Sequence, residues 1–165
     1  MKNVINEEFT PRRATQKSAG YDIFVNENIT LCPGEYKTLD TGVVFEDNDI
    51  MFSMTNTANH IISKKNPKGV FGKFSKKINL QNEYVGLIFP RSSYGFKYGL
   101  RFANSICVID QDYRDTIRLN VTVDNTLNLV KGDRIAQIVF VPWLIYGGEI
   151  VPEDLRGGGI GSTGN

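Results

Sequence analysis

The chain consists of short β-type runs that end at turn residues, and almost none of it has the periodicity of a helix. Branched and aromatic residues alternate with polar ones, and each run stops at Gly, Pro, Asn or Asp. This pattern favours a closed all-β architecture such as a jelly roll, because closure removes exposed strand edges. Ser92 and Ser93 are both suitable N-caps for one short helix that starts after them. We expect strands at 21–24, 29–31, 36–39, 43–45, 84–89, 106–109, 117–123, 135–142 and 146–151.

Length, charge and cysteine content exclude several classes of protein. The 165 residues predict a single domain, 1–165, with its own core. A net charge of +1 argues against affinity for nucleic acid over the whole surface. Cys32 and Cys107 do not form a CxxC motif and His60 is the one histidine, which argues against zinc ribbons and His-based catalysis. The chain shows no apolar leader and no long apolar run, so we expect no membrane association and an intracellular protein, cytoplasmic or, for a viral source, nuclear or elsewhere in the host cell.

The segment at about 47–82 differs in composition from the rest. Between residues 50 and 82 it contains no Asp or Glu and six lysines. We interpret it as an insertion, compatible with a β-hairpin that projects from the barrel. Most lysine runs are solvated surface, but this one could also make a weak contact with nucleic acid or an acidic protein.

The C-terminal residues 153–165 form a glycine-rich tail around the motif RGGGIGSTG. Glycines lose much backbone entropy on ordering, so such a tail is expected to be mobile. It nevertheless offers closely spaced N–H groups, two hydroxyls and the guanidinium of Arg156, which together suit a phosphate clamp.

Four further motifs place polar residues at or near strand ends. AGYDI at 19–23 sets Asp22 in an apolar strand, and PRSSYG at 90–95 offers an arginine and two hydroxyls to phosphate oxygens. VIDQDY at 108–113 places Asp110 where a carboxylate could activate water or bind a metal. GDRIAQ at 132–137 sets Gln137 among apolar residues, where a buried amide must find partners. Taken alone, each also has an ordinary explanation as a turn, cap or surface residue.

In combination and in this order, the five motifs resemble those of the all-β trimeric deoxyuridine triphosphatase (dUTPase) family. The resemblance runs from about residue 19 to residue 164 and leaves 50–82 unmatched. It implies a jelly-roll subunit in a homotrimer, with each active site at a subunit interface and closed by a neighbour's tail. It also implies that dUTP is hydrolysed to dUMP and pyrophosphate with Mg²⁺ on the triphosphate, which limits uracil in DNA and supplies dUMP.

The resemblance assigns roles residue by residue. Asp110 matches the carboxylate that activates the attacking water, Tyr113 the aromatic under the deoxyribose, and Asp22 an indirect contact to the metal. A uracil-binding hairpin is implied at Asn104, Val108 and Ile109. The phosphate and tail contacts are implied at Arg91, Ser92, Ser93, Gln137, Arg156, Ile160, Gly161, Ser162 and Thr163.

The sequence departs from the family pattern in the hairpin and in the tail. Cys107 and Asp115 stand where the family usually has glycine, and Ile160 replaces the phenylalanine that stacks over uracil. Phe96 or Tyr98 could supply the missing aromatic. Two other functions remain open: a dCTP deaminase, which would need a glutamate that 117–123 lacks, and a regulatory or binding module that uses the lysine-rich insertion.

Overall fold

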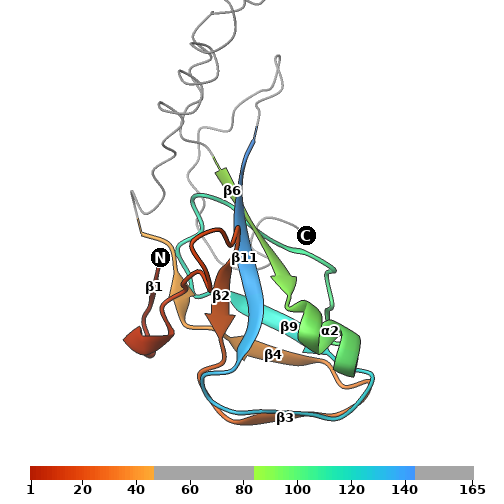
Figure 1. Cartoon of the computed structure of the whole chain (residues 1–165). Coiled ribbons are helices and arrows are strands. Elements are labelled where there is room, and N and C mark those ends of the chain that lie inside the picture. Colours follow the sequence, from red (N-terminus) through yellow and green to blue (C-terminus); the bar gives the residue numbers. More distant parts are fainter. Residues whose placement is uncertain (47–83, 144–165) are drawn as a thin grey trace, which may run out of the picture.

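The fold is known from a computed structural model that describes residues 1–46 and 84–143. A four-stranded sheet, in the order β2-β11-β6-β8, and a three-stranded sheet, in the order β4-β9-β7, contribute most of the core, and the pairs β1-β5 and β10-β3 extend it (Figure 1). The elements are β1 (Lys2–Asn3), the 3₁₀ helix η1 (Glu7–Phe9), β2 (Tyr21–Phe24), β3 (Ile29–Leu31), β4 (Lys37–Asp40), β5 (Val43–Val44), β6 (Tyr84–Pro90), α2 (Ser92–Tyr98), β7 (Arg101–Phe102), β8 (Cys107–Ile109), β9 (Arg118–Thr122), β10 (Leu127–Leu129) and β11 (Arg134–Pro142).

The predicted all-β, jelly-roll-like class is confirmed, and most of the predicted strands are present. The ranges 21–24 and 29–31 are strands at their predicted limits, and the other predicted strands within the described residues differ by a few positions at their ends. The predicted start of the helix is wrong, because Ser92 is already its first residue and Arg91 is the N-cap, without a side-chain capping bond. The insertion at about 47–82, the strand at 146–151 and the tail at 153–165 lie outside the described residues.

Strand alternation builds the core. Along β9 the pattern is exposed, buried, exposed, buried, so that Leu119 and Val121 point inward, at 1% and 0% exposure. In the facing sheet Ile23, Ile88 and Ile138 are each 0% exposed. Burying one such side chain contributes roughly 1.5–3 kcal/mol, so these inward rows stabilise the contact between the two sheets. Within the described ranges, no helix has the length and apolar character needed to cross a membrane.

An aromatic cluster joins the strands that flank the undescribed stretch 47–83. Phe45 follows β5 and Tyr84 begins β6, and their ring centroids lie 6.4 Å apart. Phe140 of β11 contacts both, with centroids at 5.7 Å from Phe45 and 5.5 Å from Tyr84. The described residues on the two sides of this stretch are therefore held together by ring packing.

The N-terminus is fixed by one buried amide. Asn3 is 2% exposed, and its Nδ2 donates to the Thr41 carbonyl at 2.8 Å. Its Oδ1 accepts from the backbone N–H groups of Ile5 and Asn6 at 2.9 and 2.8 Å. A single side chain therefore satisfies three backbone groups and connects β1 to the core.

Replacing Asn3 by leucine should lower the free energy of unfolding by about 2–4 kcal/mol, because it leaves these backbone groups without partners in a buried place. Urea unfolding followed by circular dichroism measures the change. Asn128→Ala is the matched control: its side chain accepts one exposed hydrogen bond from Thr30 at 2.8 Å, and its loss should change stability by less than about 0.5 kcal/mol. Equal losses in the two variants would contradict this account of Asn3.

Candidate active site

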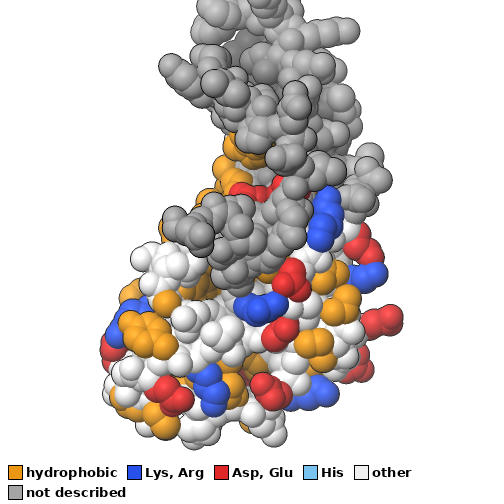
Figure 2. Space-filling view, turned by 180° about the vertical axis from the view of Figure 1, so that it is seen from behind, with side chains coloured by type: hydrophobic (Ala, Val, Ile, Leu, Met, Phe, Trp, Pro, Cys, Tyr) orange, Lys and Arg blue, Asp and Glu red, His pale blue; other side chains and the backbone are white. Residues whose placement is uncertain are grey.

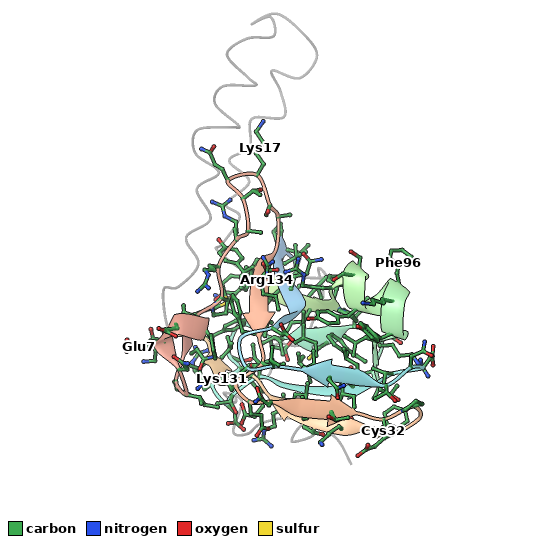
Figure 3. The ribbon with its side chains drawn as sticks, turned by 60° about the horizontal axis from the view of Figure 1, so that its bottom comes forward. Glu7, Lys17, Cys32, Phe96, Lys131 and Arg134 are labelled. Carbon is green, nitrogen blue, oxygen red and sulfur yellow. The ribbon has the colours of Figure 1, made fainter. Side chains whose placement is uncertain are left out.

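A buried carboxylate, Asp22, pairs with two arginines at one end of the four-stranded sheet. Asp22 of β2 is 7% exposed. Its Oδ1 accepts from Arg91 Nη1 at 3.1 Å and its Oδ2 accepts from Arg134 Nη1 at 3.2 Å. Arg91 follows β6, and Arg134 begins β11, the strand between β2 and β6 in the sheet. Figure 3 labels Arg134. A buried anion needs such partners, and the two arginines leave the group with a net positive charge.

Strand register aligns a polar residue of the AGYDI motif with one of the GDRIAQ motif. Gln137 on β11 pairs with Asp22 on one side and with Phe89 on the other. Directly paired residues share a face of the sheet, so the Gln137 amide and the Asp22 carboxylate project to the same side. Gln137 is half-buried rather than enclosed, so the expectation that its amide needs partners inside the core is wrong.

Gly20 makes room for the Gln137 side chain. A Cβ at residue 20 would lie 2.8 Å from Gln137 Oε1, closer than side-chain atoms can approach. The glycine of the AGYDI motif is therefore explained by contact with the glutamine of GDRIAQ, and two motifs far apart in the sequence depend on each other.

Beside the two arginines lies a polar cleft of about 390 Å³ between α2 and the turn before β11. Arg91, Lys97 and Arg134 bring three cations to its wall, and Asp133 brings one anion. Burial, followed by the charge of Asp133, raises the pKa of Tyr94 in the same wall above its usual value. The cleft is thus suited to an anionic group such as phosphate.

The helix α2 presents its motif residues outward. Ser92 and Ser93 are exposed, and Ser93 lines the cleft. Phe96 is 93% exposed and points away from the helix (Figure 3), whereas the ring of Tyr98 packs on Tyr94 at 6.1 Å between centroids. Of the two aromatic residues considered for a lid, Phe96 is the one free of intramolecular ring packing among the described residues.

Asp110 lies at the opposite end of the sheet. It follows Ile109, which pairs with Gly86 near the start of β6, so it is level with Val85. Arg91 lies beyond the other end of β6, at a distance of about 20 Å for a strand rise of about 3.3 Å per residue. The structure therefore brings Asp22, Arg91 and Gln137 together, but not Asp110 within the same chain.

The hairpin that leads to Asp110 has a strained turn. Ser105 has φ +64°, and the Ile106 N–H donates to the Asn104 carbonyl at 2.7 Å. In β8 the side chains alternate, with Val108 56% exposed and Ile109 3% exposed. The exposed Asn104 and Val108 are therefore available to a ligand, and Ile109 can offer only its backbone.

Tyr113 and Cys107 are packed inside the hairpin. Tyr113 is 2% exposed and its hydroxyl donates to the Thr116 carbonyl at 2.9 Å, so its ring is anchored below the surface next to Asp110. Cys107 is 6% exposed and belongs to the core cluster, which shows that β8 accepts a side chain where the family usually has glycine. Burial raises the pKa of the Cys107 thiol, although a hydrogen bond with Asn104 acts in the opposite direction.

Sequence reasoning missed Arg134 and Lys97 as members of the site. Arg134 stands inside the GDRIAQ motif, and the signal was available: Ile135 and Ala136 are two apolar residues in succession where strict alternation allows one. Such a break marks a β-bulge, and a bulge turns the side chains before it. Lys97 had no signal, because its position depends on how α2 packs. Arg156, Ile160, Gly161, Ser162 and Thr163 lie outside the described residues.

Comparison with known proteins identifies the family. A family model described as dUTPase matches residues 52–164. The deoxyuridine 5'-triphosphate nucleotidohydrolase of Lactococcus lactis is 31% identical over 163 residues, which cover 93% of this chain and 87% of that protein. The protein of the same name from Desulfitobacterium hafniense is 33% identical over 162 residues, covering 93% and 86%. This chain therefore belongs to the dUTPase family.

Solved structures agree with this fold. The crystal structure of dUTPase from Streptococcus mutans superposes with a TM-score of 0.59 at 27% identity, covering 87% of this chain and 92% of that chain. The dUTPase of Staphylococcus bacteriophage 80alpha gives a TM-score of 0.57 at 21% identity, covering 90% and 91%, and at this identity the likeness concerns the fold alone.

The two cysteines should differ in reactivity. Cys32 is exposed, whereas Cys107 is buried and its raised pKa leaves less thiolate at pH 8. We expect 5,5'-dithiobis(2-nitrobenzoate) to label Cys32 at least about tenfold faster in the native protein, and to label both thiols at once in denaturant. The Cys32→Ser and Cys107→Ser variants assign the two phases. Two fast phases in the native protein would show that Cys107 is not packed as described.

Gly20→Ala should weaken nucleotide binding, because the new Cβ displaces the Gln137 amide. We expect KM to rise about tenfold with little change in the melting temperature, since only the end of a flexible side chain has to move. Steady-state kinetics and thermal unfolding measure the two effects. The matched control is Gly95→Ala, where a Cβ would lie 3.7 Å from the Leu100 carbonyl oxygen, an ordinary contact. An unchanged KM in Gly20→Ala would show that the contact between the two motifs does not affect nucleotide binding.

Proposed function

We propose that this chain hydrolyses dUTP to dUMP and pyrophosphate, by attack of water on the α-phosphate. Membership in the dUTPase family supports the activity. The observation that supports roles for particular residues is the group formed by Asp22, Gln137 and the neighbouring Arg91. This group brings three of the five sequence motifs together at one end of the sheet. Removing dUTP in this way would limit uracil in DNA and supply dUMP for dTMP synthesis, in agreement with an intracellular enzyme.

The roles of the polar groups follow from the chemistry. Phosphoryl transfer needs a positioned water and neutralisation of charge more than it needs a covalent nucleophile. The exposed Asp110 has a carboxylate that can accept a proton from water, and Arg91 with Gln137 can donate to the phosphate oxygens of the departing pyrophosphate. The hairpin at Asn104–Val108 is the proposed site for uracil, read through backbone groups. Cytosine would leave such groups unpaired, which discriminates strongly.

The Mg²⁺ ion fits this site as a companion of the substrate. In the part of the chain that the structure describes, no group of three His, Cys, Asp or Glu residues comes together to hold a metal. Both oxygens of Asp22 accept from arginines, so Asp22 can reach an ion only indirectly, through water or phosphate. When bound, the ion would neutralise triphosphate charge, held mainly by phosphate oxygens and water. The dUTPase from phage phi11 of S. aureus coordinates a structural Mg(II) ion.

We further propose that the enzyme is a homotrimer with sites shared between chains. Asp110 and Arg91 lie about 20 Å apart within one chain, which is too far for both side chains to contact the same phosphate group. A second copy that brings its Asp110 hairpin to the Arg91 end of the first would complete the site. The tail residues Arg156, Ser162 and Thr163 of a further copy are proposed to close it, as the resemblance implies.

The alternative functions are less well supported. The family comparison favours dUTP hydrolysis over a module that acts through the lysine-rich insertion. On the face shown in Figure 2, the lysine and arginine side chains of the described residues lie among acidic ones, and the lysines of 50–82 are outside the described residues. The deaminase function would be supported only by release of ammonia from dCTP.

Asp110→Asn should lower kcat by a factor of about 10²–10⁴, because the amide cannot take the proton of the attacking water. KM for dUTP should change little, and pyrophosphate release in the presence of Mg²⁺ measures both. Asp112→Asn, two residues further along the same exposed loop, is the matched control and should keep most of the activity. Full activity in Asp110→Asn would remove this residue from the role of base.

Mixed oligomers test whether sites are shared. When Asp110→Asn and Arg91→Gln chains are produced together, about a quarter of the sites in a randomly mixed ring should combine one intact Asp110 with one intact Arg91. We therefore expect activity to return to about a quarter of the wild-type value, although each variant alone is inactive. Mixing the same proteins under conditions that prevent subunit exchange is the control. If the mixed sample stays inactive while hybrid oligomers are detected, each chain has its own complete site.

A further inference from the structure

A β-bulge in β11 sets the direction of Arg134. The register passes from Arg134 opposite Phe24 to Ala136 opposite Ile23, so Ile135 is an extra residue. Ile135 and Ala136 are both buried, at 1% and 0% exposure. Phe24 and Asp22 share a face of β2, and the bulge therefore puts Arg134 on the face of Asp22, whereas regular alternation would put it on the other.

The bulge is held in place by the site itself. Arg91 donates its backbone N–H to the Ile135 carbonyl at 2.9 Å, and Val25 donates to the Asp133 carbonyl at 2.9 Å. The start of β11 is thus fixed on both sides, by the strand end that carries Arg91 and by the end of β2. Backbone hydrogen bonds therefore fix the direction in which Arg134 projects.

Asp22 shares its two oxygens evenly between the arginines, at 3.1 and 3.2 Å, but the arginines differ in exposure. The Asp22 side chain is 9% exposed, that of Arg91 27% and that of Arg134 48%. A buried carboxylate that loses its partner is strongly destabilised. Arg91 can turn to a phosphate at low cost only if another cation stays on Asp22.

We propose that Arg134 is a positioning residue that stays paired with Asp22 and so releases Arg91 to the substrate phosphates. Arg134 acts through Asp22 and need not touch the nucleotide. Without it, the buried carboxylate retains Arg91, and phosphate binding competes with an internal ion pair. This inference rests on the proposed function, since it assumes that the anion met by Arg91 belongs to a nucleotide.

The test is a double-mutant cycle with two readouts, KM and kcat for dUTP and the dissociation constant of a non-hydrolysable dUTP analogue. We expect Arg134→Gln to raise KM and the dissociation constant about tenfold, with kcat changed less than about threefold. Arg134→Lys, which keeps the charge on Asp22, should restore most of the binding. In an Asp22→Asn background, where nothing retains Arg91, adding Arg134→Gln should cost less than about twofold.

Arg101→Gln is the matched control. Arg101 begins β7 and pairs with Asp124 at 2.6 Å, but both side chains are more than half exposed, at 53% and 61%, so its loss should leave both readouts unchanged.

The inference is overturned if Arg134→Gln leaves the binding of the analogue unchanged, or if it costs the same in both backgrounds, which would mean a direct contact with the nucleotide. A lower melting temperature with normal binding would also overturn it, as a purely structural role. If the wild-type protein binds the analogue but hydrolyses no dUTP, the proposed function fails while the binding cycle still decides the role of Arg134.

Discussion

The ion triad of Asp22 with Arg91 and Arg134 is the interaction on which the site depends. It joins β2, the end of β6 and the start of β11, three segments that lie side by side in the sheet. A carboxylate this deeply buried would destabilise the fold if neither arginine paired with it, so folding and anion binding use the same charges. The surplus positive charge then faces a polar cleft rather than the core.

The register of the four-stranded sheet explains why the family motifs divide into two groups. Antiparallel pairing aligns Asp22 with Gln137 and Phe89, so the motifs at 19–23, 90–95 and 132–137 meet at one end. β8 is also antiparallel to β6, so Asp110 emerges at the other end. No side-chain rotation can close a gap of about 20 Å. The shared site proposed above would therefore follow from the order and direction of the strands.

Sequence patterns predicted the parts of this molecule that depend on local order. β2 and β3 are short runs of mainly apolar residues between turn residues, and their limits were predicted correctly. β1, β7 and β10 were not predicted. β1 and β7 are only two residues long and carry too little pattern, and all three strands pair with partners that are distant in the sequence or not adjacent to them. The motifs predicted Asp22, Arg91 and Gln137 as site residues, and the structure brings these three together. The ion triad also required the bulge at Ile135, whose effect on Arg134 appears only when the strands are paired.

The described residues on either side of the stretch 47–83 meet in one aromatic cluster. The rings of Phe45, Tyr84 and Phe140 lie at the end of the sheet that carries Asp110, while the arginines gather at the other end. This aromatic cluster contains none of the three residues of the ion triad. Within one chain, the length of β6 therefore separates Phe45 and Tyr84, the described residues that flank this stretch, from Arg91.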